Sequence, residues 1–166
     1  MRINKPKFWD EKKSFYSLLL FPISLILIFL TYLRKKIIKP SKFNIPVVCI
    51  GNIYLGGTGK TPVTVFLAKK ILEKKINPVI IRKNYRNHHD EYSFIKKYFN
   101  SLIICSNRKK GIVEAENKKF DIAILDDGFQ DLSIDKDLNI ICFNQKQLVG
   151  NGFVIPAGPL RESLNS

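Results

Sequence analysis

Cysteine is scarce in this sequence of 166 residues, and acidic side chains are outnumbered by basic ones. The three cysteines, Cys49, Cys105 and Cys142, each lie inside an apolar run, and no C-x-x-C motif occurs. This spacing argues against a cysteine-based metal centre and favours buried thiols in a reducing compartment. Asp and Glu number 14 against 28 Lys and Arg, so the formal net charge is +14 and an anionic partner is expected.

Charge is absent from residues 14–33, SFYSLLLFPISLILIFLTYL, a run just long enough to span a bilayer. Residues 1–40 carry nine basic and two acidic residues, a net charge of +7, and the basic ones flank the run on both sides. Arg34-Lys35-Lys36 follows directly, with no cleavage-site pattern, which disfavours a cleaved signal peptide. Basic residues on both flanks do not suit a simple transmembrane helix, and Pro22 is expected to kink or break a helix.

We therefore favour a segment that enters one leaflet and keeps both ends on the cytoplasmic side, held by Lys and Arg contacts with anionic phospholipid. A true span and a buried core helix are the alternatives. The net charge alone would also suit nucleic acid. Half of that charge brackets the apolar run, however, and no aromatic-basic recognition motif is present, so we expect no nucleic-acid partner.

From residue 45 onward, short continuous apolar runs alternate with stretches of helical periodicity. The runs predict strands at 46–51, 77–83, 102–105, 121–127 and 138–144, and the stretches between them predict helices at 60–75, 91–99 and 109–119. Continuous apolar strands separated by helices indicate an α/β fold with a parallel sheet covered on both faces.

The stretch GNIYLGGTGKTP follows the first predicted strand and opens the first predicted helix. A standard phosphate-binding loop reads G-x-x-x-x-G-K-[ST], and Tyr54 stands where its leading glycine belongs. The strand–loop–helix context nevertheless favours nucleotide binding, because the glycines let backbone N–H groups converge at a helix N-terminus. Lys60 would reach the outer phosphates and Thr61 would bind Mg²⁺. The predicted nucleotide-binding residues are Gly56, Gly57, Thr58, Gly59, Lys60 and Thr61.

Two carboxylates end the fourth predicted strand, in DIAILDDGFQ. Ligands of open α/β sheets bind at the carboxyl ends of the strands. Asp126 or Asp127 can therefore hold Mg²⁺ opposite Thr61, although Asp-Gly is also a common turn dipeptide. A third motif, GNGFVIPAGPLRES at 150–163, is too rich in Gly and Pro for regular structure and ends in Arg161-Glu162.

In this order the three motifs resemble the tetraacyldisaccharide 4′-kinase family, the lipid A 4′-kinases, which also lack the leading glycine and begin with a basic, apolar segment near an FWD-like stretch. The resemblance implies a P-loop fold, ATP and Mg²⁺ as cofactors, and phosphorylation of the 4′-hydroxyl of a lipid disaccharide at the cytoplasmic face of the bacterial inner membrane. It assigns Lys60 and Thr61 to ATP and the metal, and Asp126 and Asp127 to the metal.

The resemblance also implies roles for residues that spacing alone does not single out. HDEY at 89–92 stands where the family has a GDEP-like stretch, so Asp90 is the candidate catalytic base, followed by Glu91. Arg108 matches an arginine of the family, and Arg161 and Glu162 are expected to close the edge of the active site. We divide the chain into a membrane-anchoring segment, 1–40, and a P-loop kinase domain, 41–166.

The sequence departs from the family at two places. RKNYR at 82–86 replaces an RGYGR-like turn and has lost both glycines, so this loop is expected to be rearranged. Family members also extend beyond PAGPLRE and carry a catalytic histidine there. His88 and His89 do not match it and are interpreted as solvated loop residues, so we interpret the chain as C-terminally truncated. The alternative function is a membrane-tethered P-loop ATPase or nucleotide switch that acts on a protein partner.

Overall fold

The computed structural model describes residues 5–11, 14–85 and 89–164. Contacts divide the chain into two compact units, each of which is described by itself. The helical unit comprises Met1–Ile38, Ile53–Thr58 and Phe143–Ser166, and the sheet unit comprises Lys39–Asn52 and Gly59–Cys142. The division at residue 40 stays a prediction, and the contacts group the segments 53–58 and 143–166 with the N-terminal segment.

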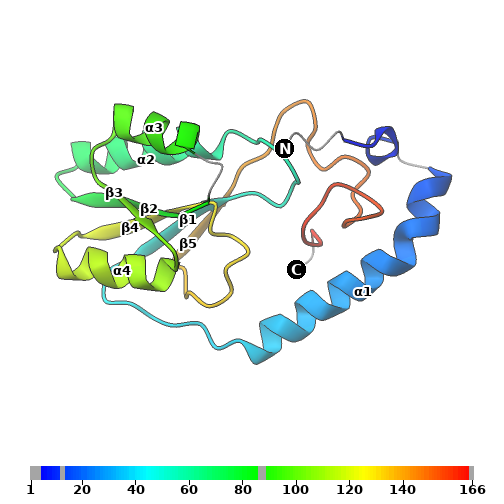
Figure 1. Ribbon diagram of the computed structural model, residues 1–166, viewed down its shortest axis with the longest axis horizontal. Coiled ribbons are helices and arrows are strands. Elements are labelled where there is room, and N and C mark those ends of the chain that lie inside the picture. Colours follow the sequence, from blue (N-terminus) through cyan, green and yellow to red (C-terminus); the bar gives the residue numbers. More distant parts are fainter. Residues whose placement is uncertain (1–4, 12–13, 86–88, 165–166) are drawn as a thin grey trace. The chain divides into compact units, whose positions relative to one another are not determined.

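The sheet unit contains five parallel strands in the order β3-β2-β4-β1-β5 (Figure 1). Their bounds are β1 Val47–Gly51, β2 Pro78–Lys83, β3 Leu102–Cys105, β4 Ile122–Asp126 and β5 Leu138–Ile141. Three helices connect them: α2 Lys60–Glu73, α3 His89–Tyr98 and α4 Arg108–Asn117. The predicted α/β class and each predicted strand and helix of this unit are confirmed, with ends that differ by a few residues.

Side chains of the sheet alternate between two cores because successive residues of a strand point to opposite faces. Ile80 of β2 packs in one cluster with residues of α2 and α3, whereas Val79 and Ile81 pack in the other with residues of α4. Figure 1 shows α2 and α3 on one face of the sheet and α4 on the other. All three strand residues are fully buried, and each such side chain contributes about 1.5–3 kcal/mol to folding.

The helical unit is organised around α1, Phe15–Ile37, preceded by a short 3₁₀ helix, η1 Lys7–Trp9. In a surface helix of a soluble protein the apolar side chains are buried and the polar ones exposed, and α1 has the opposite distribution. Ser17 and Ser24 are its buried residues. The Ser24 hydroxyl donates to the carbonyl of Val154 at 2.8 Å and accepts from the amide of Ala157 at 3.2 Å. Large apolar side chains point outward, among them Leu18, Leu19, Ile26, Phe29 and Leu30.

Helix α1 runs through Pro22 without interruption, so of the two outcomes expected there a break does not occur. A proline inside a helix removes one hydrogen bond and costs about 3 kcal/mol. The helix nevertheless continues on both sides of Pro22, from Phe15 to Ile37. By length and composition α1 is the one helix in the described residues that could cross a membrane, and its exposure does not fit a core helix.

Candidate active site

The second half of the glycine-rich loop leads directly into α2 within the sheet unit. Gly59 is the N-cap residue of this helix and adopts φ 75°, a left-handed conformation that glycine reaches at little cost. Lys60 is therefore the first residue of α2, and Thr61 follows in its first turn. Positive partial charge at this helix N-terminus favours an anion, as the sequence predicts.

The first half of the loop belongs to the helical unit, where it pairs with the segment that ends in Arg161-Glu162. Tyr54 and Leu160 form an antiparallel bridge, and both side chains are fully buried. The Leu55 amide donates to the carbonyl of Pro159 at 2.8 Å, and the Arg161 amide donates to that of Ile53 at 2.6 Å. Tyr54 thus replaces the leading glycine of a standard loop with a packed side chain, which neighbouring sequence alone does not reveal.

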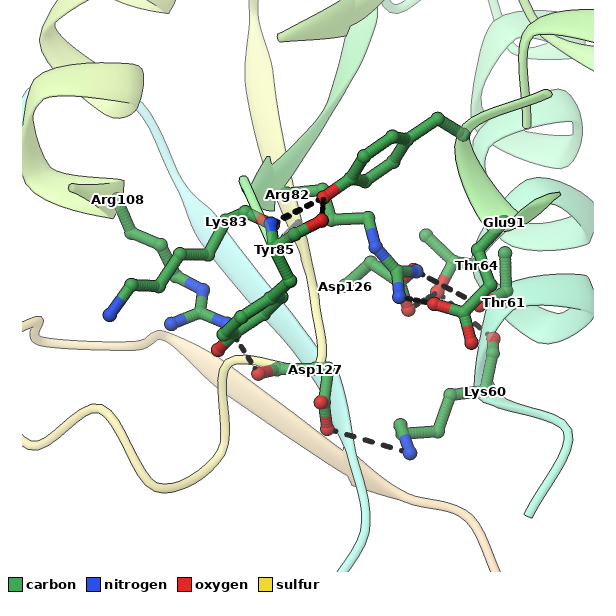
Figure 2. A network of polar contacts seen from close by, with 11 residues as sticks. Lys60, Thr61, Thr64, Arg82, Lys83, Tyr85, Glu91, Arg108, Asp126 and Asp127 are labelled. Atoms are coloured by element: carbon green, nitrogen blue, oxygen red, sulfur yellow. Dashed lines mark hydrogen bonds and ion pairs between the residues drawn. The ribbon is translucent and has the colours of Figure 1, made fainter. Parts of the chain in front are cut away.

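Four of the predicted residues meet at the carboxyl ends of β1 and β4 (Figure 2). The Thr61 hydroxyl donates to Oδ2 of Asp126 at 3.1 Å, and Lys60 Nζ lies 3.5 Å from Oδ1 of Asp127. The sequence did not single out Thr64, whose hydroxyl donates to the other oxygen of Asp126 at 3.2 Å. The structure therefore brings together the end of the glycine-rich loop and the paired carboxylates.

The Asp126 carboxyl group is fully buried. Burial raises its pKa, and the positive charge of Arg82 together with the hydrogen bonds from Thr61 and Thr64 acts in the opposite direction. A carboxylate in such surroundings needs a cation or several donors to stay ionised. Arg82 supplies the cation, and Thr61 and Thr64 supply the donors, but the effect of burial is larger and the pKa of Asp126 stays raised.

Arg82, at the carboxyl end of β2, is a second residue of this site that sequence reasoning missed. Its side chain is 4% exposed and forms ion pairs with Asp126 and with Glu91 of α3. One terminal nitrogen, Nη1, also donates to the Thr61 hydroxyl at 3.1 Å. A charged residue at the end of an apolar strand, at the same sheet edge as the glycine-rich loop, was the signal that could have identified it.

Arg108, which matches an arginine of the family, lies on the other side of the paired carboxylates, and its proposed role stays a prediction. This residue begins α4 and is 6% exposed. Its Nη2 donates to the backbone carbonyl of Asp127 at 2.6 Å, and its Nη1 lies 3.5 Å from Oδ2 of Asp131. Asp127 itself has a φ of 60°, a conformation that Asp adopts more readily than most residues. Arg108 therefore fixes the turn that carries Asp127.

The residues that the family resemblance assigns to the acceptor side of the site belong to different units of the structure. Asp90 is exposed and belongs to the first turn of α3, next to Glu91, which Arg82 holds. Arg161 and Glu162 belong to the helical unit, where Glu162 is buried and paired with Lys35. The roles of Asp90, Glu91, Arg161 and Glu162 remain proposals.

Two expectations concern the stretch before α3. His89 is the first residue of α3, so the expectation of a loop residue is wrong for it, because the helix begins earlier than its apolar spacing indicates. His88, and Arg86 of the predicted rearranged turn, lie outside the described residues.

Known proteins of one family are similar to this chain in sequence and in fold. The family model of LpxK, tetraacyldisaccharide-1-P 4′-kinase, matches residues 16–98 and 90–166. A tetraacyldisaccharide 4′-kinase of Pelagibacter ubique is 45% identical over 100% of this chain and 52% of its own length. One of Rickettsia akari is 37% identical over 96% of this chain and 54% of its own.

A solved structure of the same family is similar to this chain in fold. The crystal structure of LpxK from Aquifex aeolicus in complex with ATP aligns with a TM-score of 0.73 and 28% identity, over 90% of this chain and 55% of that one. The chain thus spans about half the length of the relatives it matches. Because the family model matches both the glycine-rich loop with its carboxylates and the segment that ends in Arg161-Glu162, the chain belongs to the tetraacyldisaccharide-1-phosphate 4′-kinase family.

Proposed function

We propose that the complete protein transfers the γ-phosphoryl group of ATP to the 4′-hydroxyl of a tetraacylated glucosamine disaccharide 1-phosphate, a step of lipid A biosynthesis. The relatives carry this activity in their names. The observation that carries the proposal here is the cluster of Lys60, Thr61, Asp126 and Asp127 at one edge of the parallel sheet. This chain supplies the nucleotide-binding part of the reaction.

The donor set suits Mg²⁺, which prefers oxygen ligands and uses one or two carboxylates together with substrate phosphates. Thr61 and Asp126 would hold the ion, with Asp127 beside them. No group of three or more His, Cys, Asp or Glu side chains able to hold a metal occurs in the described parts of the chain. When bound, the ion neutralises charge on the β- and γ-phosphates.

The chain's own residues would divide the remaining work. Backbone amides of the loop from Gly56 to Thr61 would bind the phosphates. The ammonium group of Lys60 would leave Asp127 and bind phosphoryl oxygens of the nucleotide instead. Asp90 accepts the proton of the attacking sugar hydroxyl. We propose that Arg161 and Glu162 contact the lipid acceptor.

Helix α1 suits the inner membrane, at its cytoplasmic face. The outward apolar side chains would lie among acyl chains, and the basic residues Arg34, Lys35 and Lys36 in its last turn would face anionic phospholipid headgroups. A helix whose polar side is covered by its own unit suits monotopic insertion, which would hold the enzyme where its lipid acceptor resides.

Transfer of a labelled γ-phosphate to the lipid tests the function in the complete protein. Lys60→Ala should lower transfer by about 10²–10³-fold, the usual loss on removal of a group that stabilises transition-state charge. Lys69→Ala is the matched control, because Lys69 lies on the same helix and its ammonium group stacks on Tyr98. Hydrolysis of ATP without any labelled lipid would contradict the kinase and favour an ATPase or a nucleotide switch.

A further inference from the structure

Arg82 fills the space between the side chains that would hold the divalent ion. Its Nη1 donates to the Thr61 hydroxyl at 3.1 Å and pairs with Oδ2 of Asp126, the same oxygen to which Thr61 donates. Figure 2 shows the guanidinium group between these oxygens and Glu91. Arg82 thus stands where a cation bound by Thr61 and Asp126 would have to stand.

The backbone holds Arg82 in this place. Arg82 and Asp126 are direct partners in the parallel pairing of β2 with β4, so their side chains leave the sheet on the same face. Tyr92 of α3 packs over the guanidinium group, with Cζ at 5.6 Å from the ring centroid. The position of the Arg82 side chain is therefore determined by the register of β2 with β4 and by packing against Tyr92.

The two ends of the guanidinium group have separate partners. Nη1 contacts Thr61 and Asp126, whereas Nη2 contacts Glu91. Nε of Arg82 is buried and has no hydrogen-bond partner among the described residues. Loss of the contacts at Nη1 would leave the side chain tied to α3 through Glu91, and a small rotation could give Nε a partner.

We infer that Arg82 is a positioning residue that takes the place of the divalent cation in the nucleotide-free enzyme and so makes metal binding depend on nucleotide. This inference rests on the proposed function, because it takes Thr61 and Asp126 as the metal side chains. A divalent ion that enters alone meets a monovalent cation on its own ligands, and the two repel each other at short range. Nucleotide phosphates add negative charge, which lets both cations remain.

The arrangement also predicts what Arg82 does when nucleotide and the divalent ion are bound. Freed from Thr61 and Asp126, its Nη1 can turn to a phosphoryl oxygen, for which a guanidinium fork is well suited. Glu91 would keep the side chain in place during this exchange. Because Asp90 precedes Glu91 in α3, the same ion pair would tie the candidate base to the metal side of the site.

The test measures binding of Mn²⁺ alone, without nucleotide, by thermal shift and by calorimetry on the complete protein. Wild type should bind the ion weakly, and Arg82→Gln should bind it at least tenfold more tightly, with a higher melting temperature when Mn²⁺ is present. Lys83→Gln is the matched control, since it removes the same charge from the next residue of β2 and should behave as wild type. Addition of MgATP should raise the melting temperature of wild type.

Equal Mn²⁺ affinity of wild type and Arg82→Gln would overturn the inference, and so would a gain in Lys83→Gln as large as that in Arg82→Gln. If Arg82→Gln does not fold, Arg82→Lys replaces it. A single ammonium group cannot reach Thr61 and Glu91 together, so a gain of severalfold is expected, and unchanged affinity would overturn the inference. Failure of MgATP to stabilise wild type would instead count against the proposed function.

Discussion

Lys35 of α1 and Glu162 form an ion pair, with Nζ at 2.9 Å from Oε2, although 127 residues separate them in the sequence. The carboxylate is 6% exposed and the lysine 32%. Glu162 thus depends on the last turn of the apolar helix for its counter-charge. The residue that the family assigns to the active-site edge and the helix proposed to bind the membrane are parts of one unit.

Lys35→Met should destabilise the helical unit, because it leaves Glu162 buried without its counter-charge. Loss of one partner of a fully buried pair costs about 3–5 kcal/mol. Since Lys35 is partly exposed and screened, we expect about 1–2 kcal/mol, which lowers the melting temperature by about 2–8 °C. Thermal unfolding in detergent micelles measures this shift.

Lys36→Met is the matched control for that measurement. Lys36 is the next residue of the same helix, is exposed, and stacks on Tyr32 at 4.8 Å from the ring centroid. It should shift the melting temperature by less than half as much. An equal shift in the two variants would show that charge at the end of α1, and not the pair with Glu162, determines stability.

Membrane binding through the outer face of α1 predicts a clear effect of Ile26→Asp combined with Phe29→Asp. Both side chains are more than half exposed and point away from the polar side of the helix. Each charge placed in an apolar layer costs about 2.5–3.5 kcal/mol on insertion scales. The double variant should therefore lose at least about tenfold in binding to vesicles that contain anionic phospholipid, as measured by sedimentation.

Phe66→Asp combined with Leu72→Asp provides the matched control, because it adds the same charge at exposed apolar positions of α2. This control should sediment with vesicles as wild type does. Release of both double variants alike would indicate that net charge governs binding. Point substitutions are preferable to deletion of residues 1–40, since deletion also removes the hydrogen bonds that Ser24 makes to the segment 143–166.

The sheet and the paired carboxylates were predictable because their signals are local. Each strand is a continuous apolar run, and the rule that ligands bind at the carboxyl ends of parallel strands correctly places Asp126 near Thr61. The start of α2 was likewise marked by Gly59 and by the Gly-Lys-Thr sequence. These features depend on neighbours within one strand–loop–helix unit.

Other features depend on contacts between distant segments, and no local pattern gives them. The position of Arg82 at the end of an apolar strand could have marked it as a candidate for the site, but only the pairing of β2 with β4 shows that it is buried against Asp126. The bridge from Tyr54 to Leu160 joins residues about a hundred positions apart. The burial of Ser17 and Ser24 in α1 likewise depends on distant segments and could not be deduced from the helix itself.

The contribution of the Asp131 carboxylate to stability, through Arg108 and Ser133, can be tested by its dependence on pH. Burial acts to raise its pKa, but hydrogen bonds from the side chain and backbone of Ser133 and the charges of Arg108 and Lys136 outweigh it, so the pKa is lowered. A carboxylate with a lowered native pKa adds stability above its unfolded value of about 4, and this stability is lost as the pH falls through the native value. Asp131→Asn should therefore lower the melting temperature by a few degrees at pH 7.

The difference between wild type and Asp131→Asn should shrink as the pH falls below about 4, because the wild-type carboxylate becomes protonated. Melting curves between pH 7 and pH 3 follow this change. Asp135→Asn is the control, since Asp135 is 46% exposed and lies 4.0 Å from the exposed Lys42. A difference that stays constant down to pH 3 would rule out the charge of Asp131 as its source.

Asp90→Asn separates a catalytic role from a structural one. Asp90 lies in the first turn of α3, where a negative charge interacts with the helix dipole for about 0.3–1 kcal/mol. The asparagine keeps the shape of the side chain and removes the base. If Asp90 takes the proton of the acceptor hydroxyl, turnover in the complete protein should fall by about 10²–10⁴-fold, while ATP affinity and the melting temperature change little.

Ser93→Asn is the control for a substitution at an exposed position of the same helix, and it should leave turnover near the wild-type value. A catalytic base also leaves a signature that a structural residue does not. The rise of kcat with pH on the acidic side, which reports ionisation of the base in the enzyme–substrate complex, should be absent from the residual activity of Asp90→Asn. Near-normal turnover with an unchanged pH profile would remove Asp90 from the reaction and direct attention to Glu91, whose carboxylate already contacts Arg82.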